Sequence, residues 1–275
     1  MIRRRGALLC ASLTMLLGLC ACSRRDKILQ EDRANSLKPI AEQTLNVYAA
    51  SSMREVLTDV ARQFEEERAG VSINLTFAGS QVLRLQIEHG APAEIFVSAN
   101  AEHVAALGKL SLAVETRGFA ASALALIVPK ENPAAVNNFE SVIHAKRIVL
   151  GVAEVPVGRY TQQLLNKADV RYGAGFSKQL LARVASRESN ARLVRAKVEL
   201  GAADAAVVYR TDALASLHVK QVPIPEPLNV SVKYYAAKLS KRGSRSSLAG
   251  AFFDYLCSEK TAERLEQHGF LPLPC

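Results

Sequence analysis

The feature that most constrains the fold is a strand that runs directly into a helix, within Leu45-Asn-Val-Tyr-Ala-Ala-Ser-Ser-Met-Arg-Glu55. Ser52 stands three residues before a glutamate, which is the spacing of a capping box. Val56, Val60 and Phe64 then recur every four residues and form one apolar helix face. The spacing therefore predicts a helix whose N-terminus lies at the carboxyl end of a strand, where open α/β sheets bind ligands.

The same arrangement recurs further along the chain. Apolar and polar residues alternate from Val71 to Phe77, which predicts a strand, and Ser80 follows as the cap of the next helix. Ile95-Phe-Val97 predicts a third strand, and Asn100 caps the helix after it. Strands that alternate with helices in this way indicate an α/β protein with mostly parallel sheets flanked by helices.

The pattern also predicts two sheets in two lobes, joined by a hinge. The chain is expected to cross between the lobes near Ala120–Ser122 and again near Pro223–Asn229, where three prolines interrupt the pattern. A strand is predicted at Ala123–Val128, directly after the first crossing. The expected organisation is a leader at 1–22, a tether at 23–43, lobe I at 44–121 and 228–275, and lobe II at 122–227.

Residues 1–22 have the features of a secretory leader. Three arginines form its positive region, and the uncharged run Gly6 to Leu19 is 14 residues long, too short to span a bilayer. The run ends in Leu19-Cys-Ala-Cys22, which resembles a bacterial lipobox. Cys22 is therefore the predicted lipidation site, and an ordinary signal peptide cut nearby is the alternative. Residues 23–43 are polar with no apolar period, as in a flexible tether.

The composition is that of an ordinary globular protein, with 49% hydrophobic and 22% charged residues. The net charge is +9, and removal of the three leader arginines leaves +6. The densest basic run, Lys238 to Arg245, contains no aromatic residue. We interpret it as a solvated turn and expect no nucleic-acid partner.

Two of the five cysteines, Cys257 and Cys275, lie in the predicted folded part. Cys257 falls in a helical pattern with Phe253 and Leu256, and we interpret it as a buried apolar cysteine. A disulfide between Cys257 and Cys275 is the alternative, since an exported protein meets an oxidising compartment.

No recognisable catalytic centre is present in the sequence. It contains no G-x-S-x-G, H-E-x-x-H, Walker or C-x-x-C motif, and its five histidines have neither metal spacing nor an evident nucleophile as partner. We therefore expect no enzymatic activity, no catalytic residue, no cofactor and no site for a bare metal cation.

Hydroxyls and free backbone amides instead gather at the predicted strand ends. They are the hydroxyls of Ser52, Ser80 and Tyr209 and the backbone N–H groups of Val157 and Ala191. Neutral donors at helix N-termini suit a small, fully ionised oxyanion, because every contact is a donor and the helix dipoles supply the compensating field. Four nearby arginines lie inside these helices and are expected to point away from the anion: Arg54, Arg84, Arg159 and Arg192.

The residues around these donors form recognisable segments. They are Val47-Tyr-Ala-Ala-Ser-Ser52, Phe77-Ala-Gly-Ser80, Gly90-Ala-Pro-Ala-Glu-Ile-Phe-Val-Ser-Ala99, Val155-Pro-Val-Gly158, Glu188-Ser-Asn-Ala-Arg192 and Asp204-Ala-Ala-Val-Val-Tyr209. Together they resemble the molybdate-binding proteins of bacterial molybdate ABC transporters, which have the two-lobed type II periplasmic-binding-protein fold. The resemblance covers roughly residues 45–271.

This resemblance implies a monomeric solute-binding lipoprotein that captures molybdate or tungstate between two closing lobes and delivers it to an ABC permease. The implied ligands of the oxyanion are the five donors named above. Cys22 would carry the lipid that holds the protein on the extracytoplasmic face of a membrane. Two positions depart from the family pattern, since Ala191 replaces a frequent valine and Ser51 a common alanine. Neither change removes a donor.

Three alternatives remain open at this point. The protein could bind another tetrahedral oxyanion, such as sulfate or phosphate. It could be a lipoprotein enzyme that acts on a phosphorylated or sulfated compound, although no nucleophile with a base is evident. It could also be a purely structural lipoprotein, which molybdate would not stabilise against heat.

Overall fold

The structure is a computed structural model that describes residues 43–240 and 247–275. The predicted leader, its Cys22 lipidation site and residues 23–42 of the predicted tether lie outside the described residues. Gln43, the last residue of the predicted tether, already belongs to the first strand.

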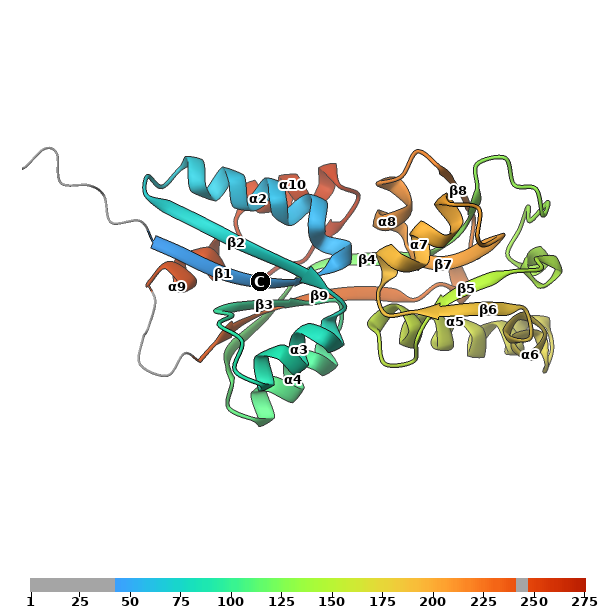
Figure 1. The fold of residues 1–275 in the computed structure, drawn as a ribbon, viewed down its shortest axis with the longest axis horizontal. Helices are drawn as coiled ribbons and strands as arrows, with labels where there is room; N and C mark the ends of the chain where they lie inside the picture. The colour runs from blue at the N-terminus through green and yellow to red at the C-terminus, as the bar shows by residue number, and fades with distance from the viewer. Residues whose placement is uncertain (1–42, 241–246) are drawn as a thin grey trace, which may run out of the picture. The chain divides into compact units, whose positions relative to one another are not determined.

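The strands form one hydrogen-bonded path in the order β2-β1-β3-β9-β4-β7-β5-β6, with β8 and β10 paired on β4 (Figure 1). β1 runs parallel to β2 and β3, and β5 runs parallel to β6 and β7. The predicted α/β class is confirmed, and the sheet is mixed because β4 and β9 run antiparallel to their neighbours. The strand bounds are β1 Gln43–Ala50, β2 Val71–Ala78, β3 Ile95–Ser98, β4 Ala113–Pro129, β5 Ile148–Gly151, β6 Val184–Glu188, β7 Ala205–Tyr209, β8 Val219–Val222, β9 Ser231–Leu239 and β10 Leu271–Pro272.

Strand β4 joins the two halves of this sheet. Its first part pairs with β9 as far as Ala123, and its second part pairs with β7 and β8 from Leu124 onward. The predicted strand at Ala123–Val128 is therefore only the end of a 17-residue strand, and the two predicted sheets are continuous. Register shifts near Gly118 interrupt the regular alternation of side chains, which hid the first part of the strand in the sequence. The limits of the predicted lobes stay a prediction.

Helices follow most of the strands, as the alternating pattern predicted. The helix bounds are α2 Arg54–Glu66, α3 Ser80–Glu88, α4 Ala101–Lys109, α5 Pro156–Tyr172, α6 Phe176–Leu181, α7 Ala191–Glu199, α8 Arg210–Leu214, α9 Ser247–Tyr255 and α10 Glu259–Gln267, with 3-10 turns η1 Ser51–Met53, η2 Glu140–His144 and η3 Glu226–Leu228. Within residues 43–240 and 247–275, no helix has both the length and the apolar character that crossing a membrane requires.

The apolar face predicted for the first helix packs into the core. Val56, Val60 and Phe64 of α2 are buried. The Phe64 ring meets the rings of Phe252 and Tyr255 edge-on, with ring centroids 5.1 Å apart in both pairs. Aromatic pairs of this kind stabilise a core by about 0.5–1.5 kcal/mol each beyond the area that they bury. α2 is thereby fixed against α9, which comes from the far end of the chain.

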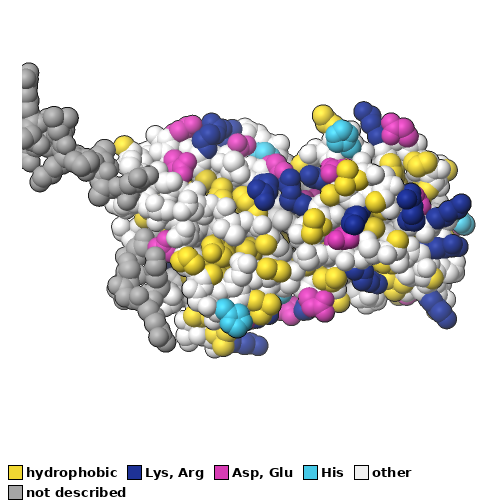
Figure 2. Space-filling view, viewed as in Figure 1, with side chains coloured by type: hydrophobic (Ala, Val, Ile, Leu, Met, Phe, Trp, Pro, Cys, Tyr) yellow, Lys and Arg dark blue, Asp and Glu magenta, His cyan; other side chains and the backbone are white. Residues whose placement is uncertain are grey.

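Charged side chains of both signs are intermixed on the face of the molecule in Figure 2. Lys238, the first residue of the predicted basic turn, lies in β9, and its Nζ donates to Glu115 Oε2 at 2.6 Å. The interpretation as a solvated turn is therefore wrong for Lys238, because the strand continues through it. Residues 241–245 of that run lie outside the described residues.

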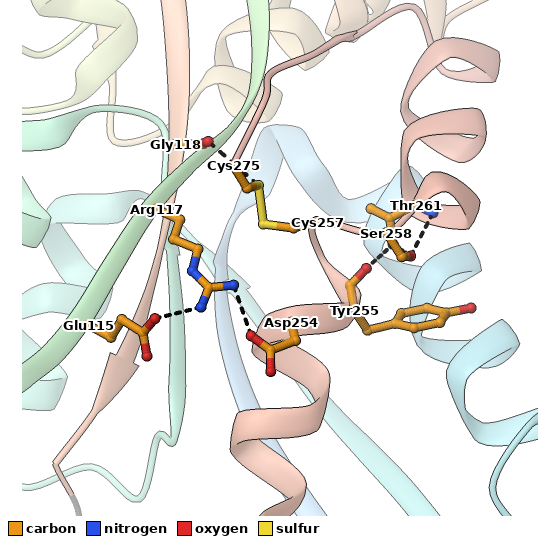
Figure 3. Close-up of a disulfide and its surroundings, with 9 residues drawn as sticks. All are labelled: Glu115, Arg117, Gly118, Asp254, Tyr255, Cys257, Ser258, Thr261 and Cys275. Carbon is orange, nitrogen blue, oxygen red and sulfur yellow. Dashed lines mark hydrogen bonds and ion pairs between the residues drawn. A yellow bond between two sulfur atoms is a disulfide. The ribbon is translucent and has the colours of Figure 1, made fainter.

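A disulfide joins Cys257 to Cys275, with the Cα atoms 5.9 Å apart (Figure 3). The interpretation of Cys257 as an unpaired buried cysteine is wrong, and the alternative of a disulfide is correct. The pairing follows from β10, which runs antiparallel to β4, and from the Leu273 N–H, which donates to the Phe119 carbonyl at 3.0 Å. These contacts bring the end of the chain alongside the end of α9.

Loss of this disulfide is expected to destabilise the protein. The bond closes a loop over a sequence separation of 18 residues, and a loop of this size corresponds to about 3 kcal/mol of stabilisation. Equilibrium urea unfolding with and without reductant measures this difference. A Cys257→Ser/Cys275→Ser variant is the control, because reductant should no longer change its stability. Equal stability of the wild type in both conditions would contradict the prediction.

Asp212 is an acidic side chain buried in α8, only 2% exposed. Its backbone carbonyl accepts from Arg195 Nη1 at 2.8 Å, whereas its Oδ2 has no hydrogen-bond partner among the described residues. Burial raises the pKa of the Asp212 carboxyl to about 7, although Arg195 and Arg192 oppose the shift. The native state therefore keeps a proton that the unfolded chain loses near its ordinary pKa of 3.8. Between these two values the native state binds more protons, so stability falls as pH rises.

An Asp212→Asn substitution is expected to remove this fall in stability. From pH 5 to pH 8 the wild type should lose roughly 2 kcal/mol of unfolding free energy relative to the variant, because only the wild type must bury a carboxylate at the higher pH. Urea unfolding of both proteins at the two pH values measures the difference. Parallel pH profiles would contradict the prediction.

Candidate functional site

The five predicted donors line one cavity, which contains about 210 Å³ of space free of protein atoms. We call it the donor cavity. Its lining residues are Ala50, Ser51, Ser52, Ala78, Gly79, Ser80, Ala99, Val155, Pro156, Val157, Asn190, Ala191 and Tyr209. None of these residues has a charged side chain. The centre of a water-sized sphere can reach only about 10 Å³ of it, far less than the roughly 300–1,000 Å³ of pockets that hold drug-sized molecules, so only a very small ligand fits.

Each donor lies at the carboxyl end of a strand. Ser52 follows β1, Ser80 follows β2, and Tyr209 is the last residue of β7. Val157 follows β5, and Ala191 follows β6. β1 pairs in parallel with β2, and β5 with β6 and β7, so the carboxyl ends within each set lie together. Because β3, β9, β4 and β7 are joined by antiparallel pairings, the two sets run in opposite directions, and their carboxyl ends meet at the cavity from its two sides. The topology therefore brings together residues that are far apart in the sequence.

The hydroxyls of Ser52 and Ser80 do not cap helices, which corrects the sequence prediction. The 3-10 turn η1 precedes α2, so Ser52 lies inside this turn rather than before the helix, and Met53 occupies the cap position without a side-chain cap bond. Ser80 is the first residue of α3, after Gly79 at the cap position. The Ser80 hydroxyl accepts instead from the Ala99 N–H at 3.2 Å. Neither hydroxyl oxygen therefore accepts a capping hydrogen bond from a helix terminus.

The predicted cap at Asn100 is confirmed, and Asn190 caps a second helix. Asn100 Oδ1 accepts from the His103 N–H at 3.4 Å, and Asn190 Oδ1 accepts from the Leu193 N–H at 3.0 Å. The Asn190 cap leaves the N–H of Ala191, the first residue of α7, for another acceptor. The first N–H groups of a helix have no partner within the helix.

The N–H of Val157 also lies in the first turn of a helix, as the second residue of α5. The preceding residue, Pro156, occupies the first turn and has no N–H of its own. Gly158 follows, and a Cβ there would lie 2.0 Å from the Val152 carbonyl oxygen. Only glycine lets the chain turn this tightly after β5, so the Gly158 position fixes where the Val157 N–H lies.

All five donor residues are at most 5% exposed. Burial raises the pKa of the Tyr209 phenol well above its usual value of 10, and the neighbouring Tyr234 adds to the shift. The phenol therefore keeps its proton and remains a donor. The Tyr160 and Tyr234 rings meet the Tyr209 ring edge-on, with centroids 6.5 Å and 5.9 Å away. These contacts hold the phenol in place.

The two sides of the donor cavity also touch each other outside it. Gln81 Nε2 donates to the Ser189 carbonyl at 2.8 Å, and a Cβ on Gly79 would lie 2.4 Å from that same carbonyl oxygen. Glycine at position 79 therefore allows the turn after β2 to approach the turn after β6.

The four arginines near the donors are held elsewhere, and none lines the donor cavity. Arg192 pairs with Glu55, and Arg159 pairs with Glu102, in both cases across the two sides of the cavity. Glu55 thus pairs with an arginine, whereas the capping box predicted a hydrogen bond between its side chain and the helix N-terminus. Arg84 pairs with Glu88 in its own helix, and the Arg54 guanidinium lies 4.4 Å from the centroid of the Phe77 ring.

Sequence reasoning missed one residue of this region, Tyr234. Its phenol donates to the Ser52 hydroxyl at 3.3 Å, although the two residues are 182 positions apart. No local pattern links β9 to the turn after β1, so only the fold reveals the contact. In residues 43–240 and 247–275 there is no cluster of three or more His, Cys, Asp or Glu side chains that could hold a metal ion.

Comparison with known proteins places the chain in a family. Residues 45–271 match the bacterial extracellular solute-binding protein family. The chain is 32% identical over 239 residues to the molybdate-binding protein ModA of Escherichia coli, which covers 83% of this chain and 89% of ModA. It is 28% identical over 268 residues to a putative ABC transporter substrate-binding lipoprotein of Bacillus subtilis, YvgL, with 94% and 95% covered.

The fold agrees with these sequence matches. The periplasmic molybdate-binding protein of Azotobacter vinelandii superposes with a TM-score of 0.70 at 20% identity, over 84% of this chain and all of that chain. The type II periplasmic-binding-protein fold and the resemblance to molybdate-binding proteins, both predicted from the sequence, are thereby confirmed. The chain belongs to the bacterial extracellular solute-binding protein family.

Proposed function

We propose that this protein binds molybdate, and tungstate in the same way, outside the cytoplasm and delivers it to an ABC permease. The observation that carries the proposal is a buried cavity in which the five predicted donors meet and no charged side chain lines the wall. The proposed ligands are the hydroxyls of Ser52, Ser80 and Tyr209 and the N–H groups of Val157 and Ala191.

A tetrahedral dianion fits the chemistry of these groups. Molybdate has four oxygens and no proton at neutral pH, so every contact that it makes can accept a hydrogen bond. A buried anion is stable only where it is well paired or hydrogen-bonded. Donors at the N-termini of α3, α5 and α7 supply such bonds together with the positive ends of three helix dipoles.

Size is the proposed basis of selectivity among tetrahedral dianions. Sulfate has the same shape and charge as molybdate but shorter bonds, so its oxygens cannot reach donors spaced for molybdate. Donors on rigid helix termini cannot move inward without a cost in packing. Tungstate has nearly the same size as molybdate and should bind in the same way.

The names of the relatives support delivery to an ABC transporter as well as molybdate as the ligand. ModA of E. coli is named for molybdate binding, and YvgL is named as an ABC transporter lipoprotein. We infer that this chain works as a monomer, anchored by a lipid on Cys22 at the extracytoplasmic face of a membrane. Its proposed lobes, 44–121 with 228–275 and 122–227, would close about the ligand and open at the permease. We assign no catalytic residue.

Ligand-dependent melting tests the proposal. Molybdate at 100 times its dissociation constant adds about 2.7 kcal/mol of stability, which raises the melting temperature of a protein of this size by roughly 5–10 °C. Tungstate should act similarly, and sulfate and phosphate at equal concentration should act much less. If only sulfate or phosphate stabilised the protein, that anion and not molybdate would be the ligand. If none of the four anions stabilised it, the proposal of oxyanion binding would be wrong.

Removal of a single donor should weaken molybdate binding. Ser52→Ala and Tyr209→Phe each delete one charge-assisted hydrogen bond, and each is expected to cost about 1–3 kcal/mol of binding free energy by calorimetry. Ser189→Ala and Tyr172→Phe are matched controls, because neither side chain lines the donor cavity. Unchanged affinity in both donor variants would contradict the assignment of these two residues.

A further inference from the structure

We propose that Tyr234 is a positioning residue for the oxyanion: it donates a hydrogen bond to the Ser52 hydroxyl and thereby directs the only proton of Ser52 toward the ligand. This assignment rests on the proposed function and deepens it. Tyr234 does not line the donor cavity, so it would act on the ligand through Ser52.

The phenol of Tyr234 is fixed beside Ser52. Tyr234 lies in β9, is fully buried, and has its oxygen 3.3 Å from Ser52 Oγ. Its ring packs edge-on between the rings of Tyr209 and Phe270, with centroids 5.9 Å and 5.3 Å away. A ring held on both sides cannot move its phenol oxygen away from Ser52 without disturbing the core.

The direction of this hydrogen bond decides what Ser52 offers to a ligand. A serine hydroxyl has one proton and two acceptor positions, and a phenol is the more acidic hydroxyl and hence the better donor. Burial raises the pKa of the Tyr234 phenol well above its usual value of 10, against the opposing effect of its neighbours Ser52 and Thr211, so the phenol keeps its proton. When Tyr234 donates, Ser52 accepts and its own proton is left for the donor cavity.

Ser80 has the same arrangement without a tyrosine. Its hydroxyl accepts from the Ala99 N–H at 3.2 Å, and an amide N–H can only donate. The proton of Ser80 is therefore also left for the donor cavity. Each serine oxygen thus accepts a hydrogen bond from a buried donor, and each serine can donate its own proton to the ligand. Ser80 provides an internal comparison, since its orientation does not depend on Tyr234.

A double-mutant cycle tests the role of Tyr234. The variants are Tyr234→Phe, Ser52→Ala and Ser80→Ala, with Tyr234→Phe combined with each serine variant. The ligand is whichever of molybdate, tungstate, sulfate or phosphate binds the wild type most tightly by calorimetry. Tyr234→Phe keeps the ring and its packing, and equal melting of the ligand-free proteins checks that the fold is retained.

Tyr234→Phe alone should weaken binding about 5-fold, because Ser52 loses its fixed orientation. The same substitution should change affinity less than about 2-fold in the Ser52→Ala protein, and again about 5-fold in the Ser80→Ala protein. A purely structural tyrosine would have the same effect in all three backgrounds, which would overturn the inference, as would no effect of Tyr234→Phe. Failure of the wild type to bind any of the four anions would instead overturn the proposed function, and the inference with it.

Discussion

The donor cavity depends on one constraint, which is that hydrogen-bond donors at the carboxyl ends of parallel strands must converge in a space shielded from water. Ser52, Ser80 and Tyr209 offer hydroxyls, and Val157 and Ala191 offer amides, with no charged side chain in the lining. A buried anion without a cation needs most of its acceptor positions filled. Parallel pairing within each set, β1 with β2 and β5 with β6 and β7, places several helix starts together. The two sets run in opposite directions, so these helix starts face one another across the cavity.

The contacts around the cavity explain how its two sides are held at a fixed distance from each other. Gly79 lets the turn after β2 approach the Ser189 carbonyl, to which Gln81 also donates. The pairs Glu55 with Arg192 and Glu102 with Arg159 link the same two sides. These arginines form ion pairs that bridge the two sides of the cavity, and the cavity interior contains no charged side chain. A neutral and rigid wall distinguishes ions by the distances between their oxygens more than by their charge.

Periodicity and cap chemistry made part of this structure predictable. The four-residue spacing of Val56, Val60 and Phe64 predicted the buried face of α2, and Asn100 caps a helix as expected. Ser52 and Ser80 were predicted at the right places but with the wrong partners. A serine at a helix start has the same sequence signature whether it caps the helix or faces a cavity, so only the fold separates the two roles.

Contacts between distant parts of the chain were not predictable. The register shifts in β4 hid half of a strand, and the contact from Tyr234 to Ser52 spans 182 positions. The Cys257–Cys275 disulfide stayed one of two alternatives, because a short pairing distance cannot be read from sequence spacing.

The most direct measurement is a crystal structure of the protein grown with molybdate, with the metal located by anomalous scattering at the molybdenum edge. We expect a single strong peak in the donor cavity, with oxygens within hydrogen-bonding distance of Ser52, Ser80, Val157, Ala191 and Tyr209. A molybdenum peak beside the arginines on the surface, with the donor cavity holding only water, would contradict it.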